Sequence, residues 1–142
     1  MADLTFGGGA GNVLEFAILA GEFNRSVSEK LVAGAEERFQ KEGYQNVKVE
    51  WVAGAFELPL AAKRLALSGN YDAIVCVGAV IRGETGHYEV VANETARGLM
   101  DVALEFGLPI ANGILTTEDE PQALARLDKG AEAVRVRWRC GK

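Results

Sequence analysis

The sequence is poor in the residues that build metal centres and disulfide frameworks. Its 142 residues include one histidine, His87, and two cysteines, Cys76 and Cys140, which lack the paired spacing of metal ligands or disulfide scaffolds. We therefore expect no metal site. Because Cys76 lies inside an apolar run, we expect it to be a small residue of the core. This sparse use of cysteine favours a protein of the reducing cytoplasm.

Excess positive charge and long apolar runs are also missing. Lysine and arginine total 15 against 20 aspartates and glutamates, which gives a net charge of −5 at pH 7. Nucleic acids and anionic membranes bind basic surfaces, so we expect neither as a partner. No apolar run is long enough to span a bilayer. The N-terminus also lacks the basic and then apolar layout of a signal peptide.

The length and composition fit one domain covering residues 1–142. With 49% apolar residues the chain can bury a proper core, and it is too short for two domains of usual size. Residues 1–12, which include the run GGGAGN, are predicted to be a flexible lead-in. Residues 134–142, VRVRWRCGK, alternate apolar and basic side chains with the period of a strand.

Short apolar runs alternate with segments of helical period about four times. Ser26 and Glu29 have the spacing of a capping box at the first helix, and Gly43 is placed to end it. The repeated order of strand and helix predicts an α/β fold, with three α/β/α layers and a parallel, flavodoxin-like sheet of about four strands. Strands are expected at 13–19, 47–52, 72–80 and 109–115, and helices at 26–42, 57–69, 85–106 and from Thr116 or Thr117 onward.

Polar and aromatic side chains follow the carboxyl end of each predicted strand. In parallel sheets ligands bind at this edge, so we expect a site there. The lone imidazole, which titrates near neutral pH, is the natural group to transfer protons. The residues at this edge are Phe23 and Asn24 after the first strand, Ala55, Phe56 and Glu57 after the second, Arg82 to His87 after the third, and Thr116 and Thr117 after the fourth.

Several of these residues also have an ordinary structural explanation. Thr85 either caps a helix or adds a hydroxyl donor to an anion site at the start of that helix. Phe23 and Phe56 either fill the core or enclose a flat heterocycle. Glu57 either complements a helix dipole or accepts hydrogen bonds from ligand hydroxyls, and Arg126 could be a helix C-terminal cation.

Several longer motifs follow one another along the chain: EFN at 22–24, GAFELP at 54–59, GAVIRGETGHYE at 78–89, NE at 93–94, GL at 98–99 and NGILTTE at 112–118. In order and spacing they resemble the 6,7-dimethyl-8-ribityllumazine synthase family over roughly residues 13–133. That family condenses 5-amino-6-(D-ribitylamino)uracil with 3,4-dihydroxy-2-butanone 4-phosphate, the penultimate step of riboflavin biosynthesis, without a metal or an organic cofactor. Its active site lies between neighbouring subunits of a pentamer, and in some members twelve pentamers form a hollow shell.

The resemblance implies a role for each matching position. His87 would be the catalytic residue that transfers protons. Phe23 would stack on the pyrimidine, whereas Asn112 and Arg126 would reach the site from the adjacent subunit. The full set of implied substrate-binding residues is Phe23, Ala55, Phe56, Glu57, Ala79, Val80, Ile81, Glu84, Thr85, Asn112 and Arg126.

After Arg126 the sequence departs from the family pattern. The stretch LDKGAEAVRVRWRCGK shortens a loop and replaces the long apolar helix that usually ends the chain. One alternative is therefore a catalytically weak, self-assembling shell or scaffold protein with the same fold. Another is a flavin- or nucleotide-binding module, but the loop AGEFNRS at 20–26 lacks the residues that cradle a phosphate.

Overall fold

The structure is a computed structural model that describes residues 14–82, 87–130 and 133. Strands and helices alternate along the chain, as the sequence predicts, and only their bounds differ by a few residues. In chain order the elements are β1 (Glu15–Gly21), α1 (Arg25–Lys41), β2 (Asn46–Val52), the 3-10 turn η1 (Ala55–Glu57), α2 (Leu58–Ser68), β3 (Ala73–Ile81), α3 (His87–Phe106), β4 (Ile110–Thr117) and α4 (Glu120–Leu124).

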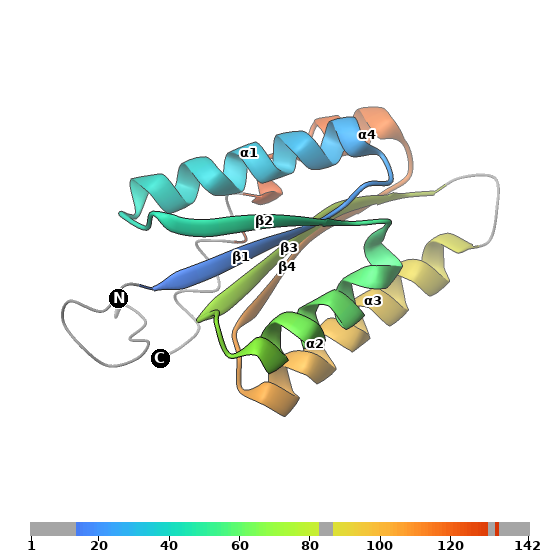
Figure 1. Cartoon of the computed structure of the whole chain (residues 1–142). Coiled ribbons are helices and arrows are strands. Elements are labelled where there is room, and N and C mark those ends of the chain that lie inside the picture. Colours follow the sequence, from blue (N-terminus) through green and yellow to red (C-terminus); the bar gives the residue numbers. More distant parts are fainter. Residues whose placement is uncertain (1–13, 83–86, 131–132, 134–142) are drawn as a thin grey trace.

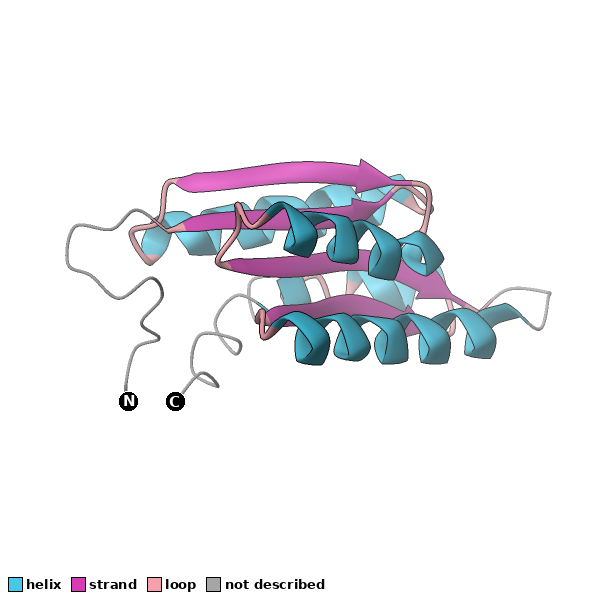
Figure 2. Cartoon of the chain, turned by 60° about the horizontal axis from the view of Figure 1, so that its bottom comes forward, coloured by secondary structure: helices cyan, strands magenta, loops and turns pink. Residues whose placement is uncertain are grey.

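The four strands form one parallel sheet in the order β2-β1-β3-β4. Helices α1 and α4 cover one face and α2 and α3 cover the other, so the predicted three-layer α/β/α fold is confirmed (Figures 1 and 2). The chain leaves β1 toward β2 on one side and later returns to place β3 on the other side. The carboxyl ends of β1 and β3 therefore flank a topological switch point, where sheets of this kind bind ligands.

Two apolar layers hold the helices on the sheet. The buried face of α1 repeats every four residues, and its members Val27, Leu31, Ala35 and Phe39 are fully buried. The Phe39 ring stacks on Phe16 of β1, with ring centroids 4.8 Å apart. Central β3 is buried along all but its last residue, as expected for a strand covered on both faces.

Helix α3 packs one face against the second layer. Thr95 and Leu99 are buried, and Val91, Ala103 and Phe106 pack against the same cluster. Although α3 spans 20 residues, neither it nor any other helix in the described part of the chain combines the length and apolar character that a membrane crossing requires.

The predicted start of α1 is wrong. The N-cap is Asn24, whose carbonyl accepts hydrogen bonds from the N–H groups of Val27 and Ser28 at 2.9 and 3.1 Å. Ser26 therefore lies inside the first turn. Glu29 does not complete a capping box but accepts a hydrogen bond from Arg25 at 3.0 Å. The predicted end is confirmed, because Gly43 has φ +90° and Tyr44 donates to the carbonyl of Phe39, as in a Schellman motif.

The predicted start of the last helix is also wrong. Thr116 and Thr117 belong to β4, and the N-cap of α4 is Asp119. Its carboxylate accepts a hydrogen bond from the N–H of Gln122 at 2.9 Å, while Gln122 Oε1 accepts one from the N–H of Glu118 at 2.9 Å. Asp119 and Gln122 have the three-residue spacing of a capping box, so the correct signal was present three residues further along.

Candidate active site

The loop after β1 lies beside the end of β2. The N–H of Glu22 donates to Val52 O at 2.8 Å and the N–H of Phe23 donates to Ala53 O at 3.1 Å, which extends the pairing of β1 with β2 past both strands. Phe23 is 74% exposed, so it does not fill the core. The ring is instead a free apolar surface at the switch point.

Gly54 lets Phe23 and Glu57 approach the same stretch of backbone. A Cβ atom at Gly54 would lie 2.9 Å from Phe23 Cδ2 and 3.3 Å from Glu57 Oε1. Any side chain at this position would therefore displace the ring. The missing side chain places a flat apolar surface next to an exposed carboxylate, which is a suitable pair for a heteroaromatic ring with a polyhydroxyl substituent.

Asn24 connects the loop after β1 to the end of β3 across the switch point. Its Nδ2 donates to Ala79 O at 3.4 Å, and the residue has φ +56°. Within the described residues it is the one non-glycine residue with positive φ, a conformation that asparagine tolerates better than most residues. The side chain that would ordinarily cap α1 is thus used to connect two segments of the site.

The end of β3 and the turn η1 contribute mostly backbone. Ala55, Ala79 and Val80 are 7%, 6% and 8% exposed, and Ile81 is half-buried. Phe56 is 54% exposed, so it does not belong to the core either. Residues 23, 55–57 and 79–81 thus gather at the carboxyl ends of β1, β2 and β3, as the sequence predicts.

His87 is the first residue of α3, the helix that follows β3. The predicted contacts of Glu84 and Thr85, and the placement of the His87 side chain, lie outside the described residues. Directly before this segment, two contacts of Arg82 hold the end of β3 against the end of β4. The N–H of Arg82 donates to Thr117 O at 2.8 Å, and Arg82 pairs with Glu118 at 3.6 Å.

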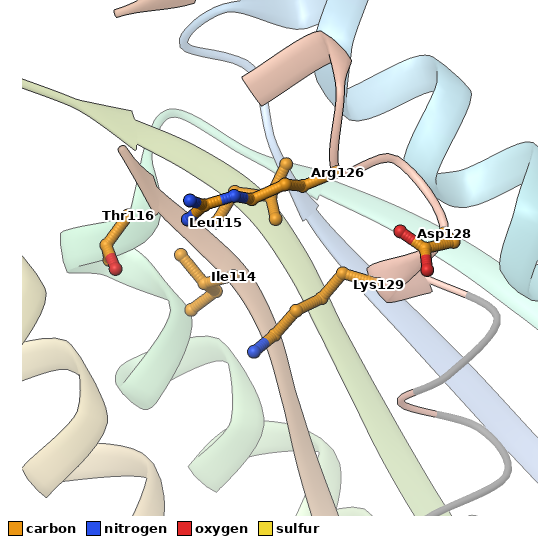
Figure 3. Close-up of a pocket in the computed structure, with 6 residues that line it drawn as sticks. All are labelled: Ile114, Leu115, Thr116, Arg126, Asp128 and Lys129. Atoms are coloured by element: carbon orange, nitrogen blue, oxygen red, sulfur yellow. The ribbon is translucent and has the colours of Figure 1, made fainter. Parts of the chain in front are cut away.

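A polar hollow lies along β4, the edge strand of the sheet. Its volume is about 240 Å³. Because Ile114, Leu115 and Thr116 are consecutive in a strand, they share one hollow only where it lies at the strand's edge. Figure 3 shows the cationic side chains of Arg126 and Lys129 reaching toward β4 from the segment after α4. The lining residues are Ile114, Leu115, Thr116, Arg126, Asp128 and Lys129.

Arg126 follows α4, which ends at Leu124, so it does not lie in the last turn of that helix. Lys129 and Asp128 received no predicted role, although they follow Arg126 within three residues; that this segment lies against β4 is decided by the tertiary structure. A hollow with two cations and one carboxylate favours a small anion such as a phosphate.

Asn112 does not join the other site residues of its own chain. It is exposed on β4, and its Oδ1 accepts a hydrogen bond from the N–H of Ile114 at 3.0 Å. Five residues separate it from Thr117 at the strand's end, which corresponds to roughly 16 Å. Asn112 therefore lies well back from the carboxyl-terminal edge of the sheet in its own chain.

The thiol of Cys76 is buried within β3 and is a poor nucleophile. Burial raises the pKa of Cys76 to about 12, because a thiolate would lose its hydration there. Among the residues that the structure describes, no three histidine, cysteine, aspartate or glutamate side chains gather as metal ligands would.

Comparison with known proteins gives one consistent family. The profile described as 6,7-dimethyl-8-ribityllumazine synthase matches residues 13–140. Over 129 residues the chain is 50% identical to the 6,7-dimethyl-8-ribityllumazine synthase of Nitrosomonas europaea, covering 89% of this chain and 79% of that protein. The protein of the same name from Protochlamydia amoebophila is 45% identical over 126 residues, covering 84% and 73%.

A solved structure, the lactose-specific IIB component domain of the phosphotransferase system from Streptococcus pneumoniae, aligns over 88% of this chain and 94% of its own. Its TM-score is 0.41 and its identity is 13%, a likeness too low to bear on the function.

Proposed function

From the premise that this chain belongs to the 6,7-dimethyl-8-ribityllumazine synthase family, we propose how its residues carry out that reaction. The enzyme is a transferase that condenses 5-amino-6-(D-ribitylamino)uracil with 3,4-dihydroxy-2-butanone 4-phosphate. The products are 6,7-dimethyl-8-ribityllumazine, phosphate and water, in the penultimate step of riboflavin biosynthesis. The alternative of an inactive scaffold is not favoured.

The observation that carries this proposal is the meeting of Phe23, Glu57 and Ala79 at the switch point. The exposed ring of Phe23 supplies a stacking surface for the pyrimidine. The Glu57 carboxylate, next to that ring, accepts hydrogen bonds from the ribityl hydroxyls. Ala55 and Phe56 complete this half of the site, and the backbone of residues 79–81 meets the polar edge of the pyrimidine.

His87 transfers protons in this proposal. The amine of the pyrimidine attacks the ketone and water leaves to give an imine, then phosphate is eliminated, and ring closure releases a second water. Each step moves a proton, and a positioned imidazole contributes about 10²–10⁴-fold to such steps. No electrons pass to an external acceptor, so the reaction needs no redox cofactor.

We assign the phosphate to the hollow at the edge of the sheet in a neighbouring subunit. Arg126, with Lys129 beside it, binds the phosphate there, and a charged hydrogen bond of this kind contributes about 1.5–3 kcal/mol. Asn112, exposed on the same edge strand, reaches the neighbour's pyrimidine. Glu84 and Thr85, which follow β3, contact the phosphate substrate from the rim, the edge of the sheet where the strands have their carboxyl ends.

Self-association is supported by apolar side chains exposed on α2 and α3. Leu60 and Leu67 of α2 are 59% and 64% exposed, and Met100 and Leu104 of α3 are 58% and 75% exposed. Large apolar groups clustered on one surface usually mark an interface. We propose a cytoplasmic homo-oligomer built from pentamers, either as single rings or as an icosahedral capsid of twelve pentamers.

The test is to mix the purified chain with both substrates. We expect the fluorescence of the lumazine to appear together with one phosphate per molecule, and neither signal when either substrate is omitted. Light scattering on the same sample measures the size of the assembly. A protein that forms particles but releases no lumazine above the uncatalysed rate would refute the proposed activity.

A further inference from the structure

We propose that Thr95 of α3 is a positioning residue for the pyrimidine half of the site. Its hydroxyl holds the turn η1, which carries Ala55, Phe56 and Glu57, in a fixed place relative to α3. This inference rests on the proposed function and adds a residue that none of the motif arguments singled out.

Thr95 is a polar residue in an apolar layer. It is 1% exposed, and Leu99 and Val102 on the same helix face are 3% and 6% exposed. Its Oγ1 donates to Ala55 O at 3.2 Å, across 40 residues of sequence. A buried hydroxyl costs free energy unless it is hydrogen-bonded, and valine would fill the same volume without that cost. The hydroxyl therefore serves to orient the turn η1, because its directional hydrogen bond fixes Ala55 to one point on α3.

The carbonyl that accepts this bond does not depend on it. Ala55 O also accepts the N–H of Leu58 at the start of α2. Removing the Thr95 hydroxyl therefore leaves no buried acceptor without a partner, and the expected cost to folding is small. Such a variant loses only the hydrogen bond between α3 and η1. Its effect on the position of η1 can therefore be measured apart from any effect on the stability of the fold.

A second contact one turn further along α3 supports the same alignment. A Cβ atom at Gly98 would lie 2.8 Å from both Cβ and Cγ of Pro59, so α3 packs closely against the first turn of α2 at this point. Positions 95 and 98 share a helix face. Together the two contacts hold η1 and the start of α2 against α3.

This alignment concerns catalysis because α3 begins at His87. His87 precedes Thr95 by eight residues, or about 12 Å along the helix axis. A helix of this length moves as a rigid body, so the Thr95 contact fixes the turn that binds the pyrimidine relative to the helix that begins with the proton-transfer residue. The phosphate hollow at β4 does not involve this contact.

The test compares Thr95→Val with Thr95→Ser in steady-state kinetics and in equilibrium binding of the ribitylaminopyrimidine alone. For Thr95→Val we expect the KM and the Kd for the pyrimidine to rise about fivefold, because one oriented hydrogen bond behind its binding turn is lost. The KM for the butanone phosphate should stay within about twofold of wild type, since Arg126 binds it elsewhere. Thr95→Ser, which keeps the hydroxyl, should restore the wild-type values.

Ser28→Ala is the matched control. Ser28 is also fully buried in a helix, and its Oγ has no hydrogen-bond partner within the described structure. This variant should leave the KM for the pyrimidine unchanged.

Two outcomes would overturn the assignment of Thr95. One is a lower kcat in Thr95→Val with both KM values unchanged, which is the signature of a smaller fraction of folded enzyme. The other is a Thr95→Ser variant as impaired as Thr95→Val. A wild-type protein that forms no lumazine in the same assay would instead refute the proposed function, and the role of Thr95 with it.

Discussion

Phe23 and Asn24 show how single residues at the site depart from local preference. Phe23 exposes 74% of its surface to water, and Asn24 adopts a left-handed backbone and directs its amide away from the helix it precedes. Neither arrangement stabilises an isolated segment. At the switch point, the exposed ring is the surface on which we propose that the pyrimidine stacks, and Asn24 connects two strand ends. Departures of this kind are expected to concentrate at functional sites.

His87→Ala should lower kcat by about 10²–10⁴-fold, because the imidazole transfers protons in several steps. The KM values should change much less, since Phe23 and Arg126 remain to bind the two substrates. Stopped-flow formation of the lumazine measures the rate, and light scattering should find an unchanged assembly. An unaltered kcat would rule out His87 as the proton-transfer residue.

Cys76 should resist alkylation in the folded protein. Burial raises its pKa from 9.0 to about 12, so at pH 8 the folded protein carries about a thousandth of the thiolate of the unfolded chain. Iodoacetamide labelling in a Cys140→Ser background, with and without urea, measures the difference. Equal labelling rates would contradict the burial.

The raised pKa of Cys76 also predicts in which direction the free energy of unfolding changes with pH. Between pH 9 and pH 12 the unfolded chain loses the Cys76 proton while the folded protein keeps it. The free energy of unfolding should therefore fall as the pH rises through that window, and Cys76 should contribute no pH dependence below it.

At the scale of whole elements, the ends of helices were harder to predict than their faces. The apolar stripe of α1 follows from its four-residue repeat, but its start depends on Asn24, whose conformation is tied to Ala79 on another strand. The start of α4 was also missed because of a contact distant in the sequence. Thr116 and Thr117 have side chains suited to capping, yet they continue β4 because β3 pairs with them to its last residue. A strand can thus continue beyond the end of its apolar run when a neighbouring strand supplies hydrogen-bond partners for its backbone.

Asp119→Ala should destabilise the protein by about 1 kcal/mol, because α4 loses its N-cap bond to the N–H of Gln122. Since Arg126 follows α4 directly, the KM for the butanone phosphate should rise while the KM for the pyrimidine stays unchanged. Urea unfolding and steady-state kinetics measure the two effects.

Glu36→Ala, an exposed substitution on α1, is the control for Asp119→Ala and should change neither quantity. An Asp119→Ala variant with wild-type stability would show that the cap contributes nothing.

At the scale of the whole molecule, the chain presents two partial sites. One is the rim with Phe23, Glu57 and Ala79, and the other is the hollow at the edge of β4 with Arg126. Asn112, also on β4, lies well back from the rim of its own chain. We propose that a ring of copies, in which the β4 edge of one subunit meets the rim of the next, joins the two partial sites into one.

Mixing two impaired variants, assayed with the butanone phosphate below its KM, tests this arrangement. Chains with His87→Ala and chains with Arg126→Ala, unfolded together and refolded at equal amounts, should regain about a quarter of the wild-type activity, because one site in four then combines an intact rim with an intact neighbour. Each variant refolded alone is the control. Mixtures that stay as inactive as their components would show that both residues act within one chain.

The sequence by itself determined the kind of elements, their order and the buried face of each, because the apolar period of a segment reports which side of it meets the core. It also placed Phe23, Glu57 and the end of β3 on one edge, since parallel strands all end there. The tertiary structure decided the strand order, the bond from Asn24 to Ala79, the bond from Thr95 to Ala55 and the hollow around Arg126. These contacts join residues far apart in the chain. The packing of helices on the sheet decides which residues meet, and no local period in the sequence encodes that packing.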